Sequence, residues 1–166
     1  MYPMKAILII SLLLFSLSDT ISQTLSFDEL ISLRSKNNIE IDKVLTGKSW
    51  SFNKEITKNT YKQYTWNYNN SPISVLVFIK TTDNNNTVTY KTSDSGCYNE
   101  FIKLINSGSF KLIEKYDIGN RTIFFYARDN YVVELEKILG ILSKNQILYS
   151  IGYMKIETYK MLKEFR

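Results

Sequence analysis

The stretch YTWNYNNSPISVLVFI, residues 64–79, decides the fold of this 166-residue chain. Tyr64, Trp66 and Tyr68 alternate with smaller polar residues, which is the period-two pattern of a strand with one buried face. The turn-forming sequence NNSP then leads into Ile73–Ile79, whose core VLVFI has no polar interruption. A continuous apolar run of this length predicts a strand that is buried on both faces.

Shorter alternating segments, separated by turn residues, predict further strands on both sides of this stretch. They lie at about 49–53, 87–92, 110–112, 122–126, 131–136 and 147–153. The connections are too short for parallel crossovers, so the strands are expected to form antiparallel meanders. Ile138–Asn145 fits a helical turn as well as an apolar loop.

Helices are predicted ahead of each group of strands. The predicted helices span 27–35, 39–45, a segment from Asp94 or Ser95 to Gly108, and one turn within 157–166. Ser26 and Glu29 form a capping box at the start of the first helix. Each helix carries one apolar stripe, so we expect the helices to lie across one face of the sheet.

The order of one helical part followed by four strands occurs twice, at a spacing of about 60 residues along the chain. The fold class is therefore predicted as α+β, with antiparallel meanders, helices packed on one face, and tandem half-repeats at 26–92 and 94–156. The alternative is that a helix followed by strands occurs twice without a repeat. Two such units would join edge to edge into one eight-stranded sheet or pack as separate layers.

In outline this arrangement is similar to the architecture of secreted β-lactamase-inhibitor-like proteins, which repeat a helix-and-sheet unit. The similarity is one of topology, without a shared sequence motif. A fold of this kind does not fix a function.

The N-terminus has the layout of a secretory signal peptide at residues 1–22. Lys5 precedes the apolar run Ala6–Leu17, which is followed by a short polar stretch. As a helix these twelve residues reach roughly 18 Å, well short of the roughly 30 Å hydrocarbon core of a bilayer. We therefore favour a cleaved signal over a membrane anchor, with contact to the membrane only during export.

Signal peptidase requires small side chains three residues and one residue before the cut, and Thr20 and Ser22 supply them. Cleavage after Ser22 leaves residues 23–166 as a single domain, and Ser18 marks a second candidate site. The protein is expected to be secreted or periplasmic.

The composition excludes several kinds of catalytic site. The chain has no His and one Cys, Cys97, so it contains no Ser-His-Asp or Cys-His unit and no His-ligated metal. We expect no catalytic residue, metal or cofactor. Cys97 is expected to be a packed apolar side chain, because a reactive thiolate would lack a histidine base.

Glu134 and Glu136 form the only close carboxylate pair on a predicted strand. A spacing of two places both side chains on one face, opposite Val133 and Leu135. The simpler interpretation is a solvated face. The alternative is a pair that carries out acid–base hydrolysis.

Tyr64, Trp66 and Tyr68 are the candidate binding residues, because a row of exposed rings suits a sugar or a peptide. The same row also suits packing against a helix. Phe124 and Tyr126 hold the equivalent place in the second half, and this favours a role in the core.

The basic excess consists mainly of lysine, since 17 of the 21 basic residues are Lys and the formal net charge is +5. Sequence-specific nucleic-acid recognition relies on Arg, so no such recognition is predicted.

The function predicted is an exported, non-catalytic binding protein, inhibitor- or immunity-like, whose partner is a protein or an envelope component. The alternatives are a carboxylate-dependent secreted hydrolase and a weak binder of polyanions or membrane surfaces. The oligomeric state is left open.

Overall fold

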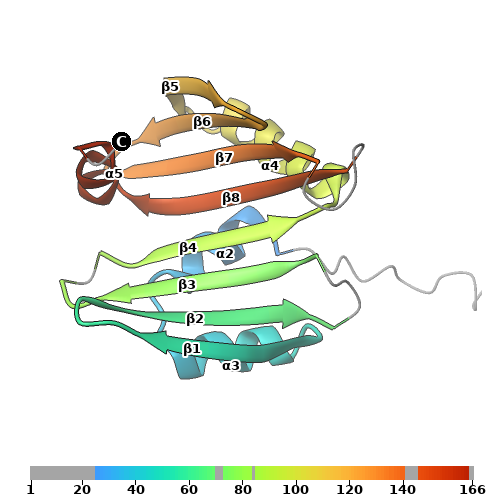
Figure 1. The fold of residues 1–166 in the computed structure, drawn as a ribbon, viewed down its shortest axis with the longest axis vertical. Helices are drawn as coiled ribbons and strands as arrows, with labels where there is room; N and C mark the ends of the chain where they lie inside the picture. The colour runs from blue at the N-terminus through green and yellow to red at the C-terminus, as the bar shows by residue number, and fades with distance from the viewer. Residues whose placement is uncertain (1–24, 70–72, 84, 141–145, 165–166) are drawn as a thin grey trace, which may run out of the picture.

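The computed structural model describes residues 25–69, 73–83, 85–140 and 146–164. The predicted export signal and its cleavage site lie outside the described residues. The described chain forms one eight-stranded antiparallel sheet in the order β1-β2-β3-β4-β8-β7-β6-β5 (Figure 1). The strands are β1 (Trp50–Thr57), β2 (Tyr61–Tyr68), β3 (Val75–Thr81), β4 (Thr87–Thr92), β5 (Lys111–Ile118), β6 (Arg121–Arg128), β7 (Tyr131–Leu139) and β8 (Ile147–Lys155). The predicted class, α+β with antiparallel meanders, is confirmed.

The two meanders, β1–β4 and β5–β8, meet along their last strands. β4 and β8 are antiparallel, with Val88 opposite Tyr153 and Tyr90 opposite Ile151. The two halves therefore join edge to edge into one eight-stranded sheet, which is the first of the two predicted arrangements. They do not pack as separate layers. Strands β1 and β5 are left as the two outer edges.

The two edge strands begin in the same way. Ser49 and Ser109 precede them with φ values of 64° and 62°, a left-handed conformation that is uncommon outside glycine. A β-bulge then interrupts pairing between Phe52 and Lys54 in β1 and between Leu112 and Glu114 in β5. Bulges twist an edge strand and so discourage pairing with another chain.

The helices are α2 (Phe27–Leu33), α3 (Asn38–Thr46), α4 (Ser95–Ser107) and α5 (Ile156–Glu164). Gly47 and Gly108 are the C-caps of α3 and α4, and Gly108 is the predicted end of the latter helix. The capping box of Ser26 and Glu29 is present. α2, α3 and α4 lie behind the sheet in the view of Figure 1, so the face toward the viewer is the one that these three helices leave uncovered.

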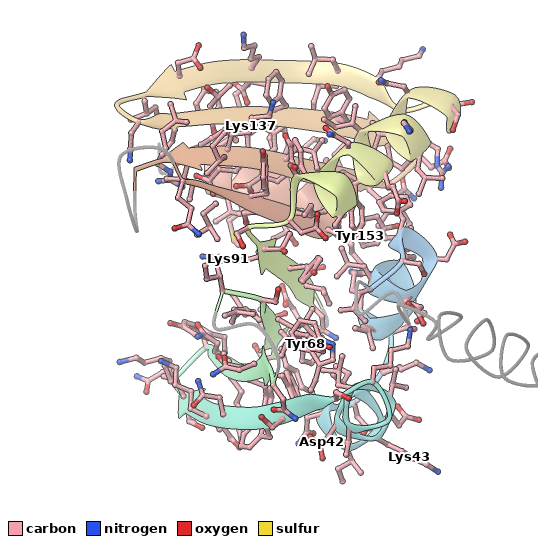
Figure 2. All side chains as sticks on the ribbon, turned by 90° about the vertical axis from the view of Figure 1, so that its right-hand side faces the viewer. Asp42, Lys43, Tyr68, Lys91, Lys137 and Tyr153 are labelled. Atoms are coloured by element: carbon pink, nitrogen blue, oxygen red, sulfur yellow. The ribbon has the colours of Figure 1, made fainter. Side chains whose placement is uncertain are left out.

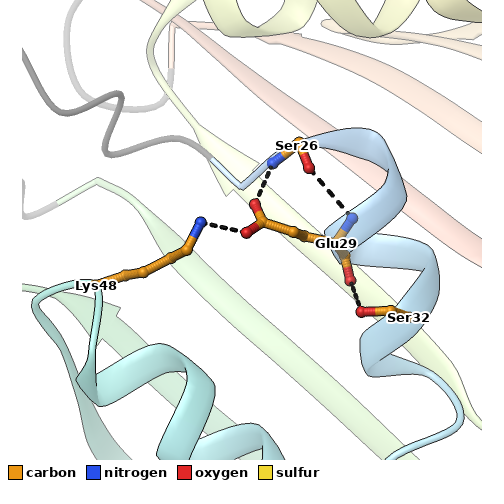
Figure 3. A network of polar contacts seen from close by, with 4 residues as sticks. All are labelled: Ser26, Glu29, Ser32 and Lys48. Atoms are coloured by element: carbon orange, nitrogen blue, oxygen red, sulfur yellow. Dashed lines mark hydrogen bonds and ion pairs between the residues drawn. The ribbon is translucent and has the colours of Figure 1, made fainter.

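One ion pair ties α2 to the segment that follows α3. The Glu29 side chain accepts from the Ser26 amide and also pairs with Lys48 (Figure 3). Lys48 lies just before β1, so the contact joins the start of α2 to the connection between α3 and the first meander. These interactions hold the pKa of Glu29 below its usual value, although partial burial works in the opposite direction. With both side chains about one-third exposed, the pair contributes little to stability.

The main core lies between the sheet and α2, α3 and α4. Its members from the sheet include Trp50, Trp66, Leu76, Phe78, Val88, Tyr90, Val133, Leu135, Ile151 and Tyr153. A second, smaller cluster on the other face contains Ile123, Phe125, Val132 and Met154 beneath Tyr159 of α5. The second meander is therefore packed on both faces.

Candidate binding face

The predicted aromatic row belongs to the core. Tyr64, Trp66 and Tyr68 are 5%, 1% and 5% exposed. The indole nitrogen of Trp66 donates to Asp42 Oδ1 of α3 at 2.8 Å, which satisfies the polar group of a buried ring. Of the two interpretations of this row, packing against a helix therefore fits the structure. Of the three rings, Tyr64 also borders a surface pocket.

β3 differs from its prediction. Leu76 and Phe78 are fully buried, whereas the side chains that point the other way, Val75, Val77 and Ile79, are half-buried. We call these three residues the β3 strip. The prediction of burial on both faces is wrong for the described chain, because no described helix covers this side of β3.

The strand register shows which residues share the face of the β3 strip. Val77 lies opposite Thr65 on one side and Thr89 on the other, and Val75 lies between Asn67 and Lys91. We call this side of β1–β4 the open face. Its further members are Ser51, Lys54, Ile56, Gln63 and Thr87. The open face thus has an aliphatic centre surrounded by polar side chains.

The same side of the second meander has carboxylates on β7 beside the apolar cluster beneath α5. Register pairs Thr65 with Val77 in the first meander, and it pairs Phe125 with Glu134 in the second. In the same way, the position of Ile79 corresponds to Glu136. In the half that α5 partly covers, carboxylates on β7 thus take the positions that Val77 and Ile79 take in the uncovered half.

Glu134 and Glu136 do share one face, as predicted, but that face is not solvated. Glu136 is 4% exposed and pairs with Arg121. In register it lies opposite Ile123, a member of the cluster beneath α5. Burial, reinforced by the charge of Glu136, raises the pKa of Glu134 to about 7. The prediction of a solvated face is wrong because the C-terminal helix and its cluster shield this part of the sheet.

Two lysines provide the charge on the open face. Within β1–β4, register places Lys54 and Lys91 on this side of the sheet and places no described carboxylate there. Lys91 points away from α2, α3 and α4, whereas Tyr68 and Tyr153 lie toward these helices (Figure 2). Lys91 also acts favourably on the ionised form of Glu134, at the border with the second meander.

Cys97 is buried in the first turn of α4, at 5% exposure. Asp94 Oδ1 already accepts hydrogen bonds from the backbone amides of Gly96 and Cys97 at this helix end. Burial raises the pKa of the thiol to about 12, and the nearby charges of Asp94 and Glu100 add to the effect. The packed role predicted for this side chain agrees with its surroundings.

Searches of family models, curated proteins and solved structures found no match to this chain. In the part of the chain that the structure describes, no helix is long and apolar enough to span a bilayer. The same described residues contain no cluster of three or more potential metal-ligating side chains of the Cys, Asp and Glu types.

Proposed function

We propose that this protein is an exported binding protein, inhibitor- or immunity-like, and that it engages a partner protein through the open face. The observation that carries the proposal is the β3 strip. Its sequence is that of a strand buried on both faces, yet the described chain buries one face only. The partner would supply the missing cover.

The composition of the face supports this proposal. An antiparallel sheet with one solvated face normally alternates apolar and polar residues. Val75, Val77 and Ile79 break that rule, although Glu134 and Glu136 show that the fold accepts charged residues at the corresponding positions. An apolar centre with a polar rim is the usual anatomy of a protein interface.

The charges indicate what the partner surface is like. Lys54 and Lys91 flank the β3 strip from the outer edge and from the border with the second meander. A matching surface has an apolar patch with carboxylates on opposite sides of it, because complementary charges fix register and speed association. We therefore expect an acidic-rimmed protein and not a sugar.

Photo-crosslinking tests the proposal. A photoreactive residue at position 77 in the full-length protein should link to one protein in the secreted or envelope fraction. The same residue in place of Lys103, which is exposed on α4, serves as the control and should not form that product. Excess unlabelled wild-type chain should compete, and the Val77→Glu variant should compete at least tenfold less well.

Each other outcome contradicts the proposal. Equal products from both positions would indicate non-specific contact. A product that consists of two copies of this chain would make the open face a self-association surface. No product from position 77, with the protein exported and folded, would mean that the β3 strip has no partner.

A further inference from the structure

A pocket of about 320 Å³ lies at the end of the first meander, where the turn after β1 meets the end of β3. Both segments are at the left-hand side of the sheet in Figure 1. Its lining consists of Lys58, Asn59, Tyr61, Lys62, Tyr64, Lys80, Thr81 and Thr82. The lining thus carries three ammonium groups and no carboxylate.

Two of these lysines are direct cross-strand neighbours. Lys62 of β2 lies opposite Lys80 of β3, and like charges at such positions destabilise a sheet. One carboxylate relieves this in part, since Lys62 Nζ lies 3.2 Å from Glu55 Oε1. The equivalent pair in the second meander is Thr122 with Lys137, which has a single charge. The doubled lysine is therefore not a requirement of the fold.

The other walls suit a small organic molecule. The half-buried Tyr61 and the edge of the buried Tyr64 line the pocket from opposite sides of the sheet, and Asn59, Thr81 and Thr82 contribute polar groups. The volume is at the low end of the range for small-molecule sites, which begins at about 300 Å³. Lysine acts as a strongly hydrated point charge with three donors, which suits an oxyanion without demanding a planar shape.

We propose that this pocket binds a small phosphate or sulfate ester, with the oxyanion between Lys62 and Lys80 and the organic part toward Tyr64, which lies on the same side of the sheet. An anion there removes the repulsion between the two lysines. Lys58, in the turn, supplies a third positive charge. Lys62, Tyr64 and Lys80 lie on the helix side of the sheet, whereas Tyr61 and Thr81 lie on the side of the open face, so the pocket wraps around the ends of β2 and β3.

An NMR titration of the ¹⁵N-labelled chain tests the proposal. The probe is phenyl phosphate, with inorganic phosphate, inorganic sulfate and phenol as separate arms. Phenyl phosphate should shift the amide signals of residues 58–62 and 80–82 saturably. Inorganic phosphate and sulfate should shift the same signals with weaker affinity, because they lack the ring.

Charge-matched variants distinguish a site from a diffuse positive field. Lys62→Gln combined with Lys80→Gln should weaken the binding of phenyl phosphate at least tenfold. Lys43→Gln combined with Lys103→Gln removes the same charge from exposed positions on α3 and α4, and should change affinity less than twofold. Spectra of both variants without ligand report whether the fold is kept.

Three results would overturn the site. The first is the absence of saturable shifts at the pocket. The second is phenol binding as tightly as phenyl phosphate, which would make the site apolar. The third is an equal loss of affinity for phenyl phosphate in the two double variants, which would mean that binding depends only on the net charge of the chain.

Discussion

Replacing Glu134 by Gln should make the protein more stable at alkaline pH. Glu134 lies opposite Phe125 in register, beside the buried Glu136, and across from Gly152 of β8. A Cβ atom at Gly152 would lie 3.4 Å from the Cβ of Glu134, so the two strands leave little room around the carboxyl. The substitution keeps the shape of the side chain and removes its charge.

The magnitude follows from the pKa of Glu134, which burial raises from 4.5 to about 7. A pKa difference of one is worth about 1.4 kcal/mol, so ionising Glu134 costs the folded state about 3 kcal/mol. Below pH 4.5 the carboxyl is protonated in both states and the cost is absent. It develops between pH 4.5 and pH 7, where only the unfolded state is ionised, and it is complete above pH 7, where both states are ionised.

Urea unfolding, followed by the fluorescence of the buried Trp50 and Trp66, measures the effect. The stability of Glu134→Gln relative to wild type should rise by about 3 kcal/mol between pH 4.5 and pH 9. Glu100→Gln removes one exposed carboxylate from α4 and controls for net charge. A difference between Glu134→Gln and wild type that stays constant over this range would mean that the pKa of Glu134 is not raised in the folded state.

A second variant tests the cause. Glu136→Gln removes the neighbouring negative charge that helps to raise the pKa of Glu134. An NMR titration of the Glu134 carboxyl in this variant should give a lower pKa than in wild type. An unchanged or higher pKa would mean that the two carboxylates do not interact.

Three further predictions concern single contacts. Asp42→Ala should cost about 1–3 kcal/mol in a denaturant titration, because it leaves the buried Trp66 N–H without its acceptor, and Asp42→Asn should recover most of this loss. Cys97 should resist a thiol reagent at pH 8 in the native protein and react once it is unfolded, and equal rates would contradict its burial. Lys80→Glu should stabilise the chain by about 0.5 kcal/mol, because it replaces a like-charge pair with Lys62 by an attractive one, and a loss of stability would contradict this.

Local patterns in the sequence predicted most of the elements. The capping box of Ser26 and Glu29 and the cap at Asp94 were readable because capping depends on residues within one turn. A second capping box, formed by Asn37 and Glu40, was present in the sequence and was missed. The tail, predicted as one turn, is the helix α5 (Ile156–Glu164), which is held by packing of Tyr159 on the second meander.

The open face and the lysine pocket could not be predicted from the sequence, because they depend on contacts between residues that are distant along the chain. Alternation placed Glu134 and Glu136 on one face, but their burial follows from α5 and from strands that are distant in sequence. The unbroken run through β3 predicted two buried faces, and only the sheet order shows that one of them is uncovered. Likewise, Lys62 and Lys80 become neighbours through the β2–β3 register.

The accessibility of the β3 strip, compared between the purified chain and a cell extract, tests the proposed binding face most directly. A Val77→Cys variant can be labelled with a maleimide, and the buried Cys97 contributes little signal. We predict rapid labelling of position 77 in the purified chain and labelling at least tenfold slower in a cell fraction that contains the proposed partner. Equal rates in the two samples would contradict the claim that a partner covers this face.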